Sequence, residues 1–427
     1  MRISHKTHNV NDLQLLTVAF DVSKDSLNCY SEFGKRGTHI LEDSFANHSR
    51  KIHSKLTELE KLSHSNKLNG LHIVCEPTGG YEQKLLKIAR AMGFSTSLVS
   101  GEAVCKAKVI ESNDTGKTDI KDPRVIFMLA TMGKTLIHRT LNGEYALLRQ
   151  LNHIYDTEDV HRTRIKGQIH HLLIQLFCDY SFKKDFLYDK TGRIIMKIYA
   201  FNPCRIVAAG FETFSQTVKQ HIPRIKAKTL QRLWDDAESS TLHQIEPEMI
   251  LLLEQRLQQL WEEFLLREQR LLATRSQMVA LYDRLREKQE PVPKPRKGLM
   301  NTFIISRILG EFGNLSDFSN TKALMRYAGM NLRERKSGYY VGKVRMSKKG
   351  RSLVRYILSQ AVFPLVRKKD LYGEYYHRKK QEGLSGTKAM TAVSRKFLKL
   401  FFALSKHNVI FDKQRVFICE SQYKKAA

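Results

Sequence analysis

Between Ile250 and Leu285 the sequence repeats apolar residues at alternating steps of three and four positions. This spacing is that of a heptad repeat, which predicts a long helix that pairs lengthwise with another helix. The partner could be a helix of the same subunit, but we favour a coiled coil with a second subunit within a helical region at 141–292. The positions on this face are Ile250, Leu253, Leu257, Leu260, Phe264, Arg267, Leu271, Thr274, Met278, Leu281 and Leu285.

The first third of the chain, residues 12–140, alternates between patterns typical of strands and of helices. Three strands in hairpin order are followed by alternating helices and strands, which predicts a mixed α/β sheet covered by helices. Strands are expected at 15–22, 26–33, 38–41, 71–76 and 95–100, and helices at 48–62, 81–92, 102–110 and 123–131.

The last third follows a stiff, proline-rich linker at 290–297. Residues 298–408 are predicted to form a mostly α domain, in which Ser319 is a possible helix cap. Its helices are expected at 302–312, 320–328, 349–365 and 387–404.

The charge of the chain indicates its kind of partner. Its 427 residues include 72 Lys and Arg against 43 Asp and Glu, a formal net charge of +29 at pH 7. Such an excess favours a polyanionic partner, and nucleic acid is the default. No apolar run approaches the ~18 residues of a membrane-spanning helix, and the first residues lack the apolar core of a signal peptide. We therefore expect no membrane association and no secretion.

The cysteine and histidine patterns indicate no metal site. The six cysteines are scattered, and no two of them form a Cys-x-x-Cys pair. The histidines show no ligand spacing either, so the sequence predicts neither a disulfide framework nor a zinc site. Thiols used in this way are typical of a reducing compartment, and we expect a cytoplasmic protein.

Two acidic residues lie at the ends of apolar strands. Asp21 lies in Val18-Ala-Phe-Asp-Val-Ser23, and Glu76 closes a strand before Pro77-Thr-Gly-Gly80. If these strands are parallel neighbours, both carboxylates emerge at the same edge of the sheet, where α/β proteins place their ligand sites. Because burying an unpaired charge is expensive, we favour a function for both, although an ion pair with a cation would also satisfy either.

A second acidic pair, Asp119 and Asp122, is three residues apart. This spacing brings both carboxylates to one side of a turn that enters a helix. Asp122 precedes Pro123 and is by itself an ordinary helix cap. Together with Asp21 and Glu76, the pair could hold the divalent cations that phosphodiester chemistry requires.

Ser337 and Gly338 could form only a turn. Their cationic surroundings favour a nucleophilic serine, because positive charge holds a phosphate nearby and stabilises a developing alkoxide. Residues 346–351 open a helix, whose free N–H groups suit a phosphate. The cations that we expect to bind nucleic acid are Arg333, Arg335, Lys336, Lys343, Arg345, Lys348, Lys349 and Arg351.

The order of four motifs resembles the DEDD transposases of the insertion-sequence one-ten family, whose relatives include the pilin-gene invertases. The resemblance covers residues 13–135, the helical middle and residues 298–405. The sequence departs from the family at Lys297-Gly-Leu-Met300, which keeps one glycine of a Gly-x-Gly turn, and near Leu332, where a proline is replaced. The motifs are Phe20-Asp-Val-Ser-Lys24, Glu76-Pro-Thr-Gly-Gly-Tyr81, Lys117-Thr-Asp-x-x-Asp122, and Tyr327-Ala-Gly-Met-x-x-Arg333 with Lys336-Ser-Gly338 and Ser347-Lys-Lys-Gly350.

The resemblance implies a RuvC-like, ribonuclease-H-type N-terminal domain that binds Mg²⁺ through Asp21, Glu76, Asp119 and Asp122. It also implies that Ser337 is the nucleophile of a C-terminal transposase domain and forms a covalent phosphoserine link with DNA. The two domains would meet in a composite site between subunits of a homodimer or homotetramer. A noncoding bridge RNA would pair with donor and target DNA.

The residues themselves leave two other functions open. A RuvC-like junction nuclease would use the four carboxylates and water, with Ser337 as a turn residue. A non-catalytic nucleic-acid-binding protein would use the carboxylates only to pair with cations.

Overall fold

The computed structural model describes residues 15–34, 38–112, 121–137, 139–243, 245–334, 336–337, 339–342, 344–368, 370–406 and 411, without the side chains of 109–112, 121, 137, 336 and 341. The chain divides into two compact units. One unit comprises residues 143–313, and the other comprises the residues before and after them.

A six-stranded sheet, in the order β3-β2-β1-β4-β5-β6, forms the N-terminal part of the first unit. β1 is buried at nearly every position, as its apolar sequence predicts for a central strand. It pairs antiparallel with β2 and parallel with β4, so the predicted mixed α/β sheet is confirmed. The strands are β1 (Leu16–Val22), β2 (Ser26–Phe33), β3 (His39–Ala46), β4 (Leu71–Cys75), β5 (Ser95–Leu98) and β6 (Leu136–Ile137).

Strand β3 is longer than its sequence predicts. Residues 38–41 were the expected strand, but β3 pairs with β2 over its whole length, from Ser26↔Ala46 to Phe33↔His39. Most of its side chains are exposed. An edge strand of this kind needs no alternation of apolar residues, because hydrogen bonds to one neighbour define it.

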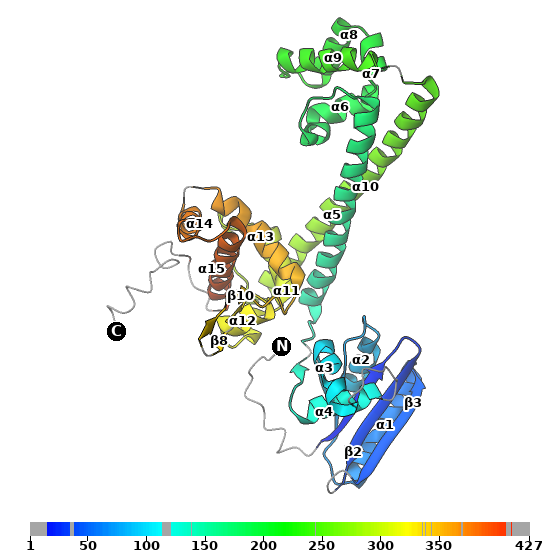
Figure 1. Cartoon of the computed structure of the whole chain (residues 1–427), viewed down its shortest axis with the longest axis vertical. Helices are drawn as coiled ribbons and strands as arrows, with labels where there is room; N and C mark the ends of the chain where they lie inside the picture. Colours follow the sequence, from blue (N-terminus) through cyan, green and yellow to red (C-terminus); the bar gives the residue numbers. More distant parts are fainter. Residues whose placement is uncertain are drawn as a thin grey trace, which may run out of the picture. The chain divides into compact units, whose positions relative to one another are not determined.

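Helices cover both faces of the sheet (Figure 1). On one face, α1 (Ser49–Ser65) and α2 (Glu82–Ala91) pack on a core that includes Leu16, Val18 and Phe20. On the other face, α3 (Gly101–Ser112) and α4 (Lys121–Thr131) pack on a second core that includes Ala19 and Val74. The sheet therefore has an apolar layer on each side.

The C-terminal part of the first unit is mostly α, as predicted. Its helices are α12 (Thr321–Tyr327), α13 (Ser352–Val366), α14 (Leu371–Gln381) and α15 (Gly386–Lys406). The cap of α12 is Asn320, not the predicted Ser319, because the Asn320 side chain accepts a hydrogen bond from the Ala323 backbone N–H at 2.9 Å. Short strand pairs lie between α12 and α13.

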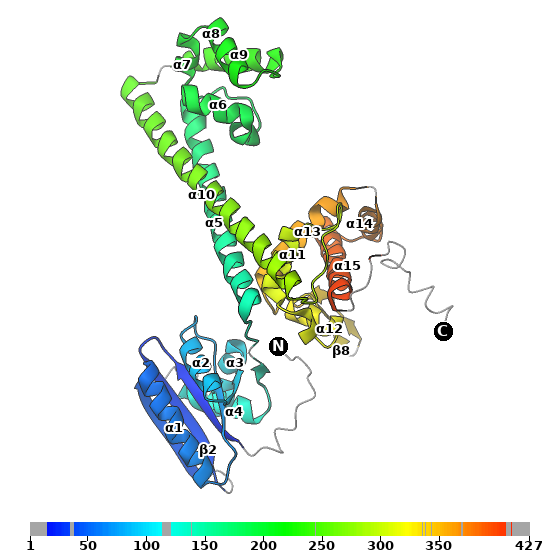
Figure 2. The ribbon, with the colours of Figure 1, turned by 180° about the vertical axis from the view of Figure 1, so that it is seen from behind.

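Two long helices, α5 (Gly143–Leu176) and α10 (Pro247–Glu287), pack along one another in the second unit (Figures 1 and 2). At one end α11 (Thr302–Phe312) packs against both of them. There the Asn152 side chain donates a hydrogen bond to the Arg307 backbone carbonyl at 2.7 Å. Residues 302–312 thus belong to the helical unit in this structure, although their sequence groups them with the last third.

Four short helices lie at the other end of the α5–α10 pair (Figures 1 and 2). One apolar core joins them to the long helices, with fully buried Phe201, Phe214 and Phe264 among its members. The helices are α6 (Lys190–Tyr199), α7 (Pro203–Ala208), α8 (Phe211–His221) and α9 (Ala227–Thr241).

The heptad face of α10 is covered within the chain. Leu257, Leu260, Phe264, Met278 and Leu285 are all buried. The helix is therefore confirmed, but a coiled coil with a second subunit along this face is not, and packing inside one subunit is what the structure contains. A heptad pattern defines the apolar face of a helix without stating which helix covers it.

Among the described residues, no helix is both long enough and apolar enough to cross a membrane.

Candidate active site

The two strand-end carboxylates are neighbours at one edge of the sheet. β1 and β4 are parallel and paired, and Phe20 is the register partner of Cys75. Asp21 and Glu76 are each one residue further along, so they occupy matching positions at the carboxyl ends of the two strands. This arrangement is the one that their sequence positions predicted.

Both carboxylates belong to the same face of the sheet. Successive residues of a strand point to opposite faces, and Phe20 and Cys75 lie in the core beneath α1 and α2. Ala19 and Val74 lie in the core beneath α3 and α4. The alternation therefore places Asp21 and Glu76 on the α3–α4 side.

Helix α4 brings a third carboxylate to this edge. Asp122 lies in the first turn of α4, one residue after its start, rather than at the predicted cap position. Its carboxylate forms an ion pair with Lys108 of α3, and both side chains are largely buried, 23% and 16% exposed respectively.

The carboxylates repel one another at Glu76. Burial raises the pKa of the half-buried Glu76 carboxyl above its ordinary value, and the negative charges of Asp122 and Asp21 raise it further. The Lys108 ammonium lowers it in part. Burial and the two neighbouring carboxylates thus both disfavour the charged form of Glu76, whereas a divalent cation bound beside it would favour that form.

The start of α3 lies directly against Glu76. A Cβ atom built on Gly101 would overlap Oε1 of the Glu76 side chain. Glycine at the first position of α3 therefore leaves the space that this carboxylate occupies. The adjacent N-terminus of α3 also favours negative charge there.

The fourth predicted ligand, Asp119, lies outside the described residues. Within the described part of the chain, the carboxylates of Asp21, Glu76 and Asp122 are gathered at one edge but form no tight ligand cluster.

Ser337 lies at the tip of a β ribbon. β7 (Leu332–Arg333) pairs with β10 (Arg345–Met346), and further out β8 (Lys336–Ser337) pairs with β9 (Tyr340–Val341). Ser337 is the last paired residue before the turn and is exposed. Gly338, the second residue of the predicted turn, lies outside the described residues. The exposed Ser337 hydroxyl is accessible to a large substrate.

Two of the predicted nucleic-acid contacts face each other across this ribbon. Arg333 and Arg345 are register partners and are both exposed. Like charges directly opposite on two strands destabilise a ribbon unless an anion lies between them. Arg335 and Lys343 lie outside the described residues, as does the side chain of Lys336.

The other predicted contacts precede α13. The loop is anchored by hydrogen bonds from the Ser347 N–H to the Asn331 carbonyl and from the Lys348 N–H to the Gly329 carbonyl, at 2.8 and 2.9 Å. Arg351 is the cap residue of α13, and no side chain caps the helix. Lys348 is exposed, whereas Lys349 forms an ion pair with Glu102.

The structure adds residues that the sequence did not single out. Lys108 and Gly101 both contact predicted ligands, and Glu102 pairs with Lys106 and Lys349, which hold the pKa of Glu102 at about 2. A lysine within a helix and a glycine at its start have no distinctive spacing, so only the packing of α3 on the sheet identifies them.

Two family models match the chain. One, described as "Transposase IS116/IS110/IS902 family", matches residues 300–377. The other, described as "Transposase" and built on the DEDD transposases of IS110, matches residues 18–178. The chain belongs to the IS110 family of DEDD transposases. It is accordingly a DNA transposase, and the family resemblance of its motifs is confirmed.

The transposase is also similar to solved structures of RuvC from Thermus thermophilus. The free RuvC is 12% identical, with 28% of this chain and 98% of that chain covered and a TM-score of 0.21. T. thermophilus RuvC in complex with a Holliday junction substrate is 13% identical, with the same coverage and TM-score. A search of curated proteins gave no match.

The raised pKa of Glu76 predicts how the thermal stability of the metal-free transposase changes with pH. The pKa of this carboxyl is raised in the folded protein, so ionising it costs stability as the pH rises above its ordinary value of 4.5. We expect Glu76→Gln to unfold at a higher temperature than the wild type at pH 7 in chelator. The difference should disappear below about pH 4.5, where both forms are uncharged. Thermal unfolding followed against pH measures it.

Glu82 offers a control, because its pKa is shifted in the opposite direction to that of Glu76. Burial opposes its charge, but hydrogen bonds from Gln83, Thr78 and Gly80 lower its pKa below the ordinary value. Its charged form therefore stabilises the fold above about pH 4.5, and this contribution is lost as the pH falls. Glu82→Gln should unfold at a lower temperature at pH 7. A Glu76→Gln variant that also unfolds earlier would contradict the repulsion among the carboxylates.

Proposed function

We propose that this transposase cuts and rejoins DNA through a phosphoserine intermediate at Ser337, assisted by divalent cations bound at Asp21, Glu76, Asp119 and Asp122. The main support is the placement of Asp21 and Glu76 on one face and at one edge of the sheet, with Asp122 beside them. The functional divisions remain those of the sequence: a metal-binding domain at 12–140, a helical region at 141–292 and a serine domain at 298–408.

The residues at the sheet edge fit a hard divalent cation. All three described donors are carboxylates, and hard cations such as Mg²⁺ prefer oxygen ligands. Burial and the charges of Asp122 and Asp21 raise the pKa of Glu76, and a bound cation would oppose this shift. The β3-β2-β1-β4-β5 order, with β3, β2 and β1 antiparallel in sequence and β4 parallel to β1, supports the ribonuclease-H-type assignment. When bound, the cations would polarise the phosphodiester and stabilise the departing oxygen.

Lys108 would stabilise the neighbouring carboxylates by its positive charge. Its ammonium pairs with Asp122 and lowers the pKa of Glu76. A bound cation would compete with Lys108 for the same carboxylate, because both positive charges favour one position. The protein therefore binds metal by exchanging an internal cation for an external one.

The serine step conserves the number of phosphodiester bonds. The Ser337 Oγ loses its proton and forms a bond to phosphorus, while the bond from phosphorus to one DNA oxygen breaks and that oxygen gains a proton. Attack by a second DNA hydroxyl on the phosphoserine reverses these changes and joins the new strands. An exposed tip of a β ribbon is a suitable place for such a hydroxyl, because a duplex can approach it.

Phosphate binding would relieve the repulsion between Arg333 and Arg345. A phosphate lying across the ribbon would contact both guanidinium groups. The uncapped start of α13, with no acidic residue in its first turn, offers backbone N–H groups to a second phosphate. The net charge of +29 supports binding of donor and target DNA and of a guiding RNA.

Assembly into a homodimer or homotetramer is supported by exposed apolar side chains on α10. Leu251, Leu252 and Leu272 of α10 are 56%, 59% and 64% exposed. A second copy would bury this surface. Such an assembly, acting in the cytoplasm, would let Ser337 of one subunit act with the carboxylates of another.

A junction nuclease that uses water is the second candidate. The local structure of Ser337 is compatible with it, since the residue is the last paired position of β8, a role that requires no nucleophile. In that case the carboxylates would suffice for cleavage and no covalent intermediate would form.

Two variants separate these functions. We expect Ser337→Ala to abolish protein–DNA adducts and to lower cleavage by ~10³-fold or more, because it removes the nucleophile. Asp21→Asn should abolish both by removing a metal ligand. Denaturing gels of labelled DNA, incubated with protein, Mg²⁺ and the RNA that co-purifies with it, show both products. Ser276→Ala, at an exposed serine of α10, is the matched control.

Full cleavage by Ser337→Ala would instead establish the water-dependent nuclease. If the wild-type protein binds DNA but neither cleaves it nor forms adducts with any guide RNA, the protein would be a non-catalytic nucleic-acid-binding protein.

The space at Gly101 gives an independent prediction. Gly101→Ala forces the Glu76 carboxylate to move, while alanine suits the helix at least as well as glycine. We expect an unfolding temperature equal to or above that of the wild type, with Mg²⁺-dependent cleavage lowered by ~10–100-fold.

Gly167→Ala in α5, where the new methyl meets no neighbour, is the control and should leave cleavage unchanged. If Gly101→Ala cleaved DNA as fast as the wild type, the position of the Glu76 carboxylate against α3 would not be required for cleavage.

The Arg333–Arg345 pair predicts the salt dependence of DNA binding. Replacing both with glutamine should reduce the slope of log affinity against log salt by about one unit for each lost phosphate contact. The stability of the free protein should not fall, because a repulsive pair is removed. Fluorescence anisotropy over a salt series measures the slope, with Arg256→Gln on α10 as the control. An unchanged slope in the double variant would show that Arg333 and Arg345 do not contact DNA phosphates.

A further inference from the structure

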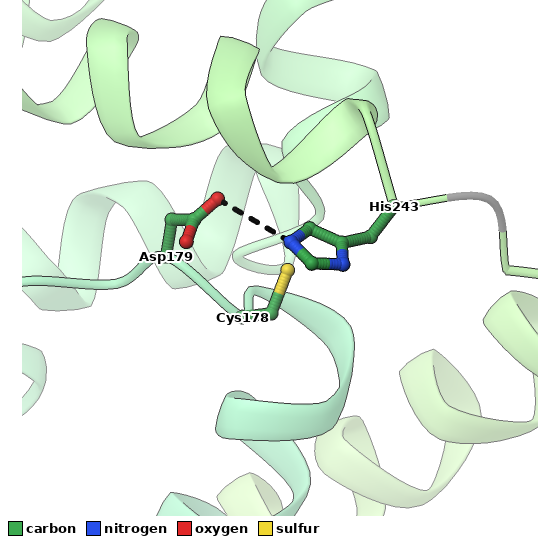
Figure 3. Close-up of side chains that lie close together, drawn as sticks. All are labelled: Cys178, Asp179 and His243. Atoms are coloured by element: carbon green, nitrogen blue, oxygen red, sulfur yellow. Dashed lines mark ion pairs between the residues drawn. The ribbon is translucent and has the colours of Figure 1, made fainter.

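Three potential metal ligands meet in the helical unit, whereas the carboxylates described above belong to the other unit. Cys178 and Asp179 lie in the turn after α5, and His243 lies just after α9 (Figure 3). One ligand atom from each lies within 4.8 Å of the other two. The Nε2 of His243 is 3.8 Å from Oδ2 of Asp179.

The side chains converge on a common point. In Figure 3 the Cys178 sulfur and the Asp179 carboxylate both lie on the side of the His243 ring that bears Nε2. In a nucleophile–histidine–carboxylate relay, opposite nitrogens of the ring would contact the two partners. Convergence on a single nitrogen is instead the arrangement of ligands around an ion.

The donor set selects zinc. Thiolate, imidazole and carboxylate are all zinc ligands, whereas Mg²⁺ and Ca²⁺ prefer oxygen. With Zn–ligand bonds of about 2.0–2.3 Å, the donor atoms of a tetrahedral site lie roughly 3.3–3.7 Å apart. The separation of 3.8 Å between His243 and Asp179 is close to this range. The His243 side chain is 63% exposed, so the ring can adjust its position.

Hydrogen bonds position two of the ligands before any ion binds. The Ser239 hydroxyl donates to Oδ2 of Asp179 at 2.8 Å. The Asp179 N–H donates to the hydroxyl of buried Ser240 at 3.0 Å, and the Cys178 thiol lies 3.9 Å from the Ser240 carbonyl. Groups that orient a ligand in this way are typical of metal sites.

We propose that Cys178, Asp179 and His243 bind one Zn²⁺, with water as the fourth ligand. Binding displaces the Cys178 thiol proton to solvent and involves no redox change. The ion joins the turn after α5 to the end of α9 and fixes the start of the connection to α10. The site lies in the helical unit, and it does not depend on the proposed recombination chemistry.

Cobalt substitution tests the site in the full-length protein. The protein is stripped with chelator under a phosphine reductant and titrated with Co²⁺ in excess Mg²⁺, which occupies oxygen-ligand sites. We expect one Co²⁺ per chain, with the absorption of a four-coordinate ion and a cobalt–thiolate charge-transfer band. The carboxylates at the sheet edge contain no sulfur and cannot produce that band. Zn²⁺ should displace the Co²⁺ and raise the unfolding temperature by about 5–10 °C at a hundredfold excess over Kd.

Variants assign the signal to these side chains. Cys178→Ser should remove the charge-transfer band, and His243→Ala should weaken Zn²⁺ binding at least tenfold, with both variants folded by circular dichroism. Cys204→Ser and His171→Ala, at an exposed cysteine and an exposed histidine of the same unit, should bind as the wild type does. Absence of the band in the wild type, its persistence in Cys178→Ser, or binding only at millimolar metal would each overturn the proposal.

Discussion

The parallel pairing of β1 with β4 determines where two carboxylates of the proposed metal site lie. It aligns Phe20 with Cys75, so the next residue of each strand is a carboxylate at the same edge. A shift of either strand by one residue would move its carboxylate to the opposite face, beneath α1 and α2, where burial without a partner is costly. The apolar residues that fix the register therefore also fix the relative positions of Asp21 and Glu76.

The packing of α3 on the sheet limits the negative charge at this edge. Helix α3 supplies the Lys108 ammonium to Asp122 and places its first residue, Gly101, against Glu76. The cation lowers repulsion, and the glycine allows the carboxylate to approach the helix. Burial, Asp122 and Asp21 nevertheless keep the pKa of Glu76 raised despite Lys108. A fold that neutralised the site fully would gain stability but would lose affinity for an external cation.

The sequence predicts the parts of this structure that depend on local pattern. The apolar strands ending in Asp21 and Glu76 were recognisable, and their adjacency followed once the strands were taken as parallel neighbours. The partner of α10 was not recognisable, because a heptad pattern is the same for an internal helix and for another subunit. Lys108 and Gly101 gain their roles only from the packing of α3, and β3 is defined by its pairing with β2. Asp119 and the bridge RNA stay predictions.

Cys178 and His243 illustrate the same limit for metal ligands. Zinc motifs are recognised in sequence when two ligands share one turn or hairpin, whereas here a long run of helices separates the histidine from the other two residues. The fold brings them together because α9 returns to the end of α5, where Ser240 anchors the turn. The two candidate metal sites differ in donor chemistry. A set of carboxylates selects a hard, exchangeable cation suited to catalysis, and a set with sulfur and nitrogen retains zinc. The two sites therefore differ in the cation that their ligands favour.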